Sequence, residues 1–222
     1  MRISIIIPAL NEEKCIEETL ENLVSNHNPA EIIVVDAGST DSTAQKASRF
    51  AKVIQSERGR AQQMNQGARE ATGDVFLFLH ADTFLPENAL NLIEETLNQK
   101  DCDAGRFFMQ FDENKFSLNL FSSYTRFRCF SYGDQALFIR KSLFESLEGF
   151  RGDVPFEDVD FFKRLSKVQK FALIKNPVTT SARRFTSQGS WTQKWINLFL
   201  VSFYYLGLDI SSLKARFYPD VR

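Results

Sequence analysis

Four short polar clusters hold the residues whose types and spacing could do chemistry: residues 8–12, 36–41, 57–60 and 80–82. A carboxylate such as Asp82 can bind a divalent cation that bridges two phosphates, because Mg²⁺ and Mn²⁺ prefer hard oxygen ligands. Arg60 can meet a phosphate through paired guanidinium contacts. Asp36 can accept hydrogen bonds from a base or a ribose, and backbone N–H groups at the helix start after Gly38 can help to hold an anion.

Strands and helices that alternate along the first hundred residues must position these clusters. The apolar runs predict buried strands at residues 3–7, 32–35, 53–55 and 75–79. Helices are expected from Asn11 until Pro29, from Ser39 or Thr40 to about residue 50, over residues 61–71, and from Pro86 to about residue 98. This alternation predicts an α/β fold with a parallel sheet, in which all four clusters meet at one edge.

The alternation loosens after residue 100, where the pattern mixes short strands and helices. Strands are expected at residues 105–111, 136–140, 171–174 and 178–181, the last two separated by Pro177. Helices are expected at residues 116–127, from residue 141, at residues 157–165 and at residues 191–206. The last of these is strongly apolar. It could pack on the core, form a dimer interface or lie on a membrane surface.

The composition is that of an ordinary soluble globular protein, at 43% hydrophobic and 25% charged residues. A net charge of −1 gives no electrostatic reason to expect nucleic acid or an anionic membrane as a partner. The three cysteines Cys15, Cys102 and Cys129 lack metal-type spacing, which favours reduced thiols in the cytoplasm. The apolar N-terminal run is too short for a signal peptide.

Each of these residues also has a purely structural interpretation. Asn11 and Ser39 are equally well explained as helix caps, and Asp36 as a turn former. Arg60 alone would be a surface residue, and His80 a polar group at a strand end rather than a metal ligand. The acidic run at residues 157–160 suits the first turn of a helix. What favours function is the shared location of the clusters at one sheet edge.

The clusters also form ordered motifs: Pro8-Ala9-Leu10-Asn11-Glu12, Val34-Val35-Asp36-Ala37-Gly38-Ser39-Thr40-Asp41, His80-Ala81-Asp82, Gly133-Asp134-Gln135 and Phe156-Glu157-Asp158-Val159-Asp160. In this order they resemble the family 2 glycosyltransferases, which have the GT-A fold. The likeness covers nearly the whole chain. The run at residues 59–67 and the Tyr-Pro-Asp-Val-Arg ending resemble a small bacterial subgroup, the radical-SAM/selenodomain-associated transferases.

The resemblance implies a role for each matched position. The nucleotide-sugar site would comprise Pro8, Asn11, Glu12, Asp36, Ser39, Asp41, Arg60, Ala81 and Asp82. Within it, Asp36 would contact the base, usually uracil, and Asp82 matches the last acid of the Asp-X-Asp metal motif. Asp158 would deprotonate the acceptor hydroxyl with Glu157 in support. The acceptor side would be shaped by Gly133, Asp134 and Gln135.

The implied activity is inverting, metal-dependent transfer of a sugar from a nucleotide-diphosphate sugar, with UDP as the expected nucleotide, to an acceptor hydroxyl. Mg²⁺ or Mn²⁺ would be held by Asp82, the donor diphosphate and water. Two positions depart from the family pattern: Ala37 replaces a second Asp, and His80 replaces the first acid of the metal motif. The alternatives are a catalytically silent nucleotide-sugar-binding protein and, ranked lower, a sugar nucleotidyltransferase.

We therefore expect a single domain over residues 1–222, with a Rossmann-like, mostly parallel central sheet and C-terminal helices. Residues 1–100 would form the nucleotide-binding half, residues 101–185 the acceptor and catalytic half, and residues 186–222 a helical appendage. The expected location is cytoplasmic, with the helix at residues 191–206 available for peripheral contact with the inner membrane or for homodimerisation. The acceptor is left open and includes lipid-linked molecules.

Overall fold

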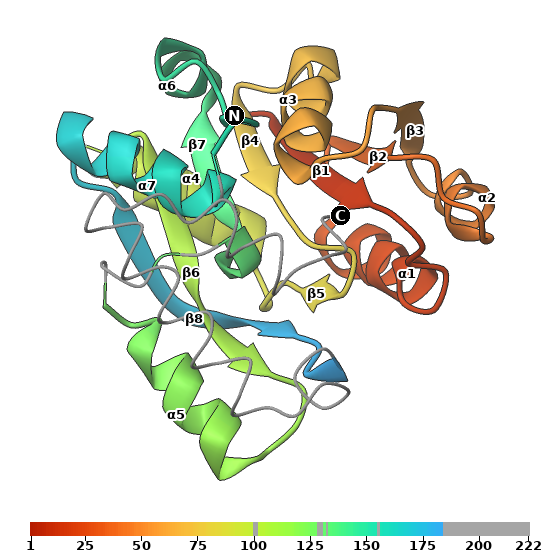
Figure 1. Cartoon of the computed structure of the whole chain (residues 1–222). Helices are drawn as coiled ribbons and strands as arrows, with labels where there is room; N and C mark the ends of the chain where they lie inside the picture. The colour runs from red at the N-terminus through yellow and green to blue at the C-terminus, as the bar shows by residue number, and fades with distance from the viewer. Residues whose placement is uncertain (100–101, 128–130, 132, 155, 184–222) are drawn as a thin grey trace.

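The computed structural model describes residues 1–99, 102–127, 131, 133–154 and 156–183. Eight strands lie within these residues: β1 (Ile3–Ala9), β2 (Glu31–Asp36), β3 (Lys52–Gln55), β4 (Val75–Phe78), β5 (Thr83–Phe84), β6 (Ala104–Phe111), β7 (Leu137–Arg140) and β8 (Ala172–Thr180). They form one sheet with the order β3-β2-β1-β4-β7-β6-β8-β5 (Figure 1).

Helices connect most of the strands. They are α1 (Ile16–His27), α2 (Thr43–Ala47), α3 (Arg60–Glu70), α4 (Ala89–Gln99), α5 (Phe116–Tyr124), α6 (Lys141–Ser146) and α7 (Glu157–Val168), with a short 3₁₀ helix η1 (Gly133–Gln135). The predicted alternation over the first hundred residues is confirmed, and strands β3, β2, β1 and β4 pair in parallel. Parallel pairing brings the carboxyl ends of these strands to one edge, as expected.

The second half of the sheet is mixed. β7 runs antiparallel to both β4 and β6, whereas β6 and β8 are parallel. β5, which follows Asp82 directly, was not predicted and pairs antiparallel with the end of β8. The fold is therefore α/β, as predicted, with a mostly parallel sheet that includes antiparallel strands.

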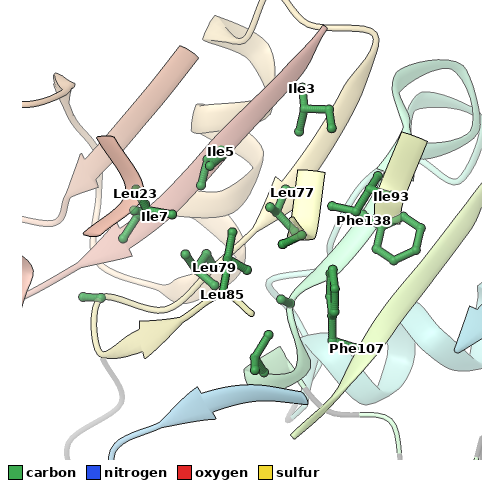
Figure 2. Close-up of a cluster of buried hydrophobic side chains, with 14 of the residues drawn as sticks. Ile3, Ile5, Ile7, Leu23, Leu77, Leu79, Leu85, Ile93, Phe107 and Phe138 are labelled. Atoms are coloured by element: carbon green, nitrogen blue, oxygen red, sulfur yellow. The ribbon is translucent and has the colours of Figure 1, made fainter. Parts of the chain in front are cut away.

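Successive side chains along the strands point to opposite faces of the sheet, and an apolar core lies on each face. Ile5 and Ile7 of β1 belong to one core with residues of α1 and α4, and Figure 2 shows Ile7 beside Leu23 of α1 and Ile93 of α4 beside Phe138. Ile6 points to the other face, where α3, α6 and α7 pack. The sheet is thus a middle layer between two sets of helices, which is why its strands are apolar on both faces.

Phenylalanines lock the start of α7 against β4. The ring centroids of Phe78 and Phe150 lie 5.0 Å apart, and those of Phe150 and Phe161 lie 4.5 Å apart. Phe161 is fully buried, and burying such a side chain contributes about 1.5–3 kcal/mol. This packing holds the acidic N-terminus of α7 close to the carboxyl edge of the parallel strands.

Three local predictions were wrong. α1 begins at Ile16, so Asn11 does not cap it; Asn11 instead adopts φ 53° in a turn. α2 begins at Thr43 rather than after Ser39 or Thr40, because those residues hydrogen-bond to the neighbouring loop. The two short strands around Pro177 are one strand, β8, since an irregularity in its pairing with β6 accommodates the break in pattern.

The predicted helix at residues 191–206 and the appendage at residues 186–222 lie outside the described residues. Within the described part of the chain, no helix combines the length and apolar character needed to cross a membrane.

Candidate active site

The loops after β1 and β2 are tied to each other by side chain to backbone hydrogen bonds. The N–H of Asn11 donates to Ser39 Oγ at 2.9 Å, and the N–H of Thr40 donates to Asn11 Oδ1 at 2.9 Å. The left-handed backbone of Asn11 is one that asparagine tolerates, and it turns the amide toward the second loop. Two of the predicted nucleotide-site residues, Asn11 and Ser39, are therefore brought into direct contact.

Asp36, at the end of β2, organises the loop that follows it. Its Oδ2 accepts hydrogen bonds from the N–H groups of Gly38 (3.1 Å) and Ser39 (3.0 Å) and from Gln55 Nε2 (3.2 Å). Its Oδ1 accepts the hydroxyl of Ser39. The side chain is buried, and most of the roughly four acceptor positions of a carboxylate are used. Remaining acceptor capacity for a base lies on Oδ1.

Asp41 joins the second loop to the segment before α1. Its carboxylate accepts hydrogen bonds from the hydroxyl and the N–H of Thr43 and from the N–H of Glu13. Partial burial acts to raise the pKa of Asp41, but these hydrogen bonds outweigh it and hold the pKa below its usual value. Asp41 is therefore a charged residue that holds the second loop and the segment before α1 together beside the predicted nucleotide site.

The N-terminal half of α3 carries contacts that the sequence analysis did not assign. The buried amide of Gln63 donates to the carbonyls of Ala9 (2.9 Å) and Val35 (2.8 Å), which bridges the ends of β1 and β2. A Cβ on Gly67 would overlap Ile6, so this glycine lets α3 approach the sheet. A polar residue on the apolar face of a predicted helix is the sequence signal that could have identified Gln63.

Asp82 lies beside Glu12 and Arg183 at the end of the next loop. Arg183 Nη2 is 3.1 Å from Asp82 Oδ2 and also donates to Glu12 Oε2. The acidic side chains are buried, at 6% exposed for Glu12 and 8% for Asp82, whereas that of Arg183 is 35% exposed. Glu12 and Asp82, which come from different predicted clusters, therefore share one cation from the far end of the described chain.

Arg60, at the start of α3, joins the donor-side loops to α7. Its Nη2 contacts His80 Nε2, and its Nε lies 3.6 Å from Glu157 Oε1, too far for a hydrogen bond. Because a guanidinium can only donate, Nε2 of His80 accepts and its lone pair is occupied. This supports the interpretation of His80 as a satisfied polar group rather than a metal ligand.

Asp158 is held by two backbone groups at the N-terminus of α7. The N–H of Gly133 donates to its Oδ2 at 2.7 Å, and the N–H of Val159 donates to its Oδ1 at 2.8 Å. A Cβ on Gly133 would overlap Arg60 Nη2, so a larger residue here would displace the guanidinium. Each carboxylate oxygen of Asp158 retains acceptor capacity for a further proton donor.

Asp134, next to Gly133, is the most perturbed carboxyl of this region. Burial, then the charge of Asp158, raise its pKa to about 6, although the charge of Arg60 opposes them. Its Oδ1 is buried and makes no hydrogen bond with any described residue, and the same holds for Arg60 Nε. A buried polar atom without a partner is costly and is common where a ligand or water binds.

The other predicted residues lie at the same edge. Pro8 pairs with Val35 near the end of β1, and the carbonyl of buried Ala81 accepts the hydroxyl of Thr19 at 2.8 Å. Gln135 is fully buried at the end of η1. Asp160, by contrast, pairs with Arg164 at 2.7 Å and anchors α7 rather than the site.

The donor atoms present fit a divalent cation in chemistry but do not form a complete binding site. Asp82 and Glu12 offer hard carboxylate oxygens that already face a cationic group. No cluster of three or more His, Cys, Asp or Glu side chains suited to a metal occurs among the described residues. A cation here would need further oxygen ligands from a bound phosphate or from water.

The chain has the same fold as several solved glycosyltransferase structures. The chain superposes on residues 1–349 of TarS from S. aureus, solved with UDP-GlcNAc, with a TM-score of 0.69 and 21% identity, covering 82% of this chain and 58% of that one. It superposes on the mannosyltransferase PcManGT from Pyrobaculum calidifontis, solved with GDP-Man and Mn²⁺, with a TM-score of 0.68 and 23% identity, covering 94% and 64%. These similarities establish the GT-A fold.

Residues 4–144 match the model of glycosyl transferase family 2, so the chain belongs to this family. A dolichol-phosphate mannosyltransferase of Pyrococcus furiosus is 35% identical over 121 residues, which are 50% of this chain and 34% of the relative. A poly-beta-1,6-N-acetyl-D-glucosamine synthase of Staphylococcus aureus is 32% identical over 95 residues, or 39% and 23%. The chain thus spans about a third or less of the curated relatives it matches.

Proposed function

We propose that this protein is a glycosyltransferase that moves a sugar from a nucleotide-diphosphate sugar, UDP-linked by expectation, to an acceptor hydroxyl with inversion at the anomeric carbon. The observation that carries the proposal is a path of contacts at one sheet edge. Arg60 contacts His80, two residues before Asp82, and Gly133 lies against both Arg60 and Asp158. Family membership and the nucleotide sugars bound by proteins of the same fold support it.

The donor half of the mechanism uses the loops after β1 and β2. The Asn11–Ser39 contact preforms a turn beside Asp36, whose Oδ1 is the atom for a base contact. Because the turn is built by its own hydrogen bonds, little ordering remains when the nucleotide binds. As part of this proposal, residues 1–100 supply the donor half and residues 101–185 the acceptor half.

Asp82 is the residue that would hold Mg²⁺ or Mn²⁺ together with the donor diphosphate. When bound, the cation offsets the negative charge that develops on the diphosphate leaving group. Arg60 adds a fixed positive charge between the two halves of the site, close to where that charge develops.

Asp158 is the base that removes the acceptor proton during attack on the anomeric carbon. The N–H groups of Gly133 and Val159 orient its carboxylate and leave each oxygen able to accept. Glu157 faces Arg60 at 3.6 Å, so it positions the guanidinium and supports the base. A base and a leaving group on opposite faces of the sugar produce a single displacement and therefore inversion.

A donor panel tests this function. UDP- and GDP-linked sugars are incubated with the full chain, with and without Mn²⁺, and native-state binding is measured by thermal shift, since a ligand that binds only the folded state raises the melting temperature. At least one nucleotide sugar should raise it in a Mn²⁺-dependent manner, and that donor should then release nucleoside diphosphate with hydroxyl acceptors. Absence of a shift with every donor would contradict the proposal, and Mn²⁺-dependent binding without transfer would favour a silent binding protein.

A further inference from the structure

Pairing between β5 and β8 brings the last described residues of the chain next to Asp82. Thr83 pairs with Thr180 in the antiparallel ladder, and their hydroxyls lie 3.0 Å apart in a hydrogen bond. The N–H of Ser181 donates to the carbonyl of Asp82 at 3.2 Å, which continues the same register by one residue. Arg183 therefore reaches the carboxylate of Asp82 because of the strand pairing, despite its distance in the sequence.

The guanidinium of Arg183 compensates two buried acids at once. Its Nη2 is 3.1 Å from Asp82 Oδ2 and is hydrogen-bonded to Glu12 Oε2. Two neighbouring buried carboxylates repel each other and are destabilising without a cation. Arg183 reduces the formal charge of the cluster from two negative charges to one, so it does electrostatically what a bound metal would do.

This internal cation cannot be removed by a change of pH. An arginine guanidinium stays protonated in proteins, and this one is hydrogen-bonded to Glu12 Oε2. The side chain is 35% exposed, which leaves its guanidinium accessible from solvent. Arg183 can therefore vacate Asp82 only by rotating away as a charged group.

We propose that Arg183 competes with the divalent cation for Asp82 Oδ2, so that metal binding requires displacement of the guanidinium. The inference deepens the proposed function, because it concerns the metal that the proposed donor would bring. In the absence of donor the internal cation is favoured and Mn²⁺ binds weakly. The diphosphate of a donor supplies extra oxygen ligands to the metal and shifts the competition toward it.

Direct titration of the donor-free full chain with Mn²⁺ tests the competition, with binding followed by calorimetry or by electron paramagnetic resonance. Arg183→Gln should bind Mn²⁺ about tenfold or more tightly than the wild type, since it removes a positive charge beside the site. The double variant Arg183→Gln with Asp82→Asn should lose this gain. Arg49→Gln is the matched control, because Arg49 is an exposed arginine that pairs with Glu17 away from the site and should leave the affinity unchanged.

Two further measurements keep the inference testable if the glutamine variant does not fold: the Mn²⁺ affinity of Arg183→Lys and the side-chain signals of the wild type. The lysine variant keeps the charge and should retain the weak affinity of the wild type. In the wild type, saturating Mg²⁺ should change the side-chain ¹⁵N signals of Arg183 and leave those of Arg49 unchanged. Equal Mn²⁺ affinity in folded wild type and Arg183→Gln, or a gain that survives loss of Asp82, would overturn the inference.

The measurement is separate from the test of the proposed function, because no sugar transfer enters it. A protein that transfers sugar but shows no effect of Arg183→Gln on Mn²⁺ binding would contradict only the competition. A protein that shows the expected gain but neither binds nor transfers any nucleotide sugar would contradict only the proposed function.

Discussion

The donor-side loops and the acceptor-side cluster are built on different physical principles. On the donor side, Asp36 and Asp41 are satisfied by backbone and hydroxyl groups from their own loop and its neighbour. On the acceptor side, Asp134 leaves a buried oxygen without a hydrogen bond to the described residues, and Arg60, which joins the two sides, leaves a buried nitrogen in the same state.

This difference separates loops whose charged groups are already satisfied from a cluster whose buried groups are not. Charged groups whose hydrogen bonds are satisfied hold a loop in one conformation. Buried groups with unused hydrogen-bonding capacity gain most from a ligand, because their desolvation cost has already been incurred. We infer that the donor loops supply shape and that the acceptor-side cluster supplies reactivity, and three predictions test this contrast.

The largest expected effect is on Asp158. Asp158→Asn removes the proposed base while keeping an oxygen that can accept the N–H of Gly133, so the transfer rate should fall by about 10²–10⁴-fold. Donor affinity, measured by calorimetry, should change by less than about twofold because the donor loops are untouched. Asp153→Asn, at an exposed aspartate in the segment before α7, is the control. Undiminished transfer by Asp158→Asn would assign the base elsewhere.

The next effect is a pH dependence of stability from Asp134. Its pKa rises from the ordinary value of 3.8 to about 6 in the folded protein. A carboxyl with a raised folded-state pKa favours folding below its unfolded pKa, and this contribution is lost as the pH rises through about 6. The loss is about 3 kcal/mol in the free energy of unfolding, at about 1.4 kcal/mol per pKa unit.

Urea unfolding between pH 4 and pH 7 would measure this dependence, a range that follows from the two pKa values. Asp134→Asn cannot ionise and should lack this component, so its stability relative to the wild type should increase with pH. Parallel pH profiles for the two proteins would show that Asp134 has an ordinary pKa in the folded protein.

The smallest of the three effects is on the preformed donor loop. Asp36→Ala leaves the N–H groups of Gly38 and Ser39 without their acceptor, which should destabilise the protein by about 2 kcal/mol. Asp74→Ala is the matched control, since exposed Asp74 accepts one N–H, from Arg2, and its loss should cost less than about 1 kcal/mol. If Asp36→Ala and Asp74→Ala lowered the free energy of unfolding equally, the hydrogen bonds of Asp36 would not stabilise its loop more than an ordinary surface contact does.

Local patterns made much of the site predictable. Asp36 and Asp82 follow short apolar runs, and turn residues bound those runs, so their position at the carboxyl edge could be inferred without coordinates. The same patterns predicted helix caps at Asn11 and Ser39 that the structure does not have, because asparagine and serine are favoured in turns as well as at helix starts. Their side chains bond across to each other's loops, which only the packing of two strands decides.

The role of Arg183 could not be predicted in the same way. Its pairing with Asp82 depends on the short strand β5, whose two residues carry too weak a pattern to predict.

The sequence by itself determined the α/β alternation, the polar clusters at the carboxyl edge of the sheet, and the family. These depend on apolar periodicity and ordered motifs, which are properties of short stretches of chain. The tertiary structure alone decided which charges meet. Arg60 reaches His80 and Glu157 because α3 and α7 pack on the same face of the sheet, and Arg183 reaches Asp82 through the β5–β8 register. Such contacts depend on the pairing and packing of distant segments, which no local spacing of residues encodes.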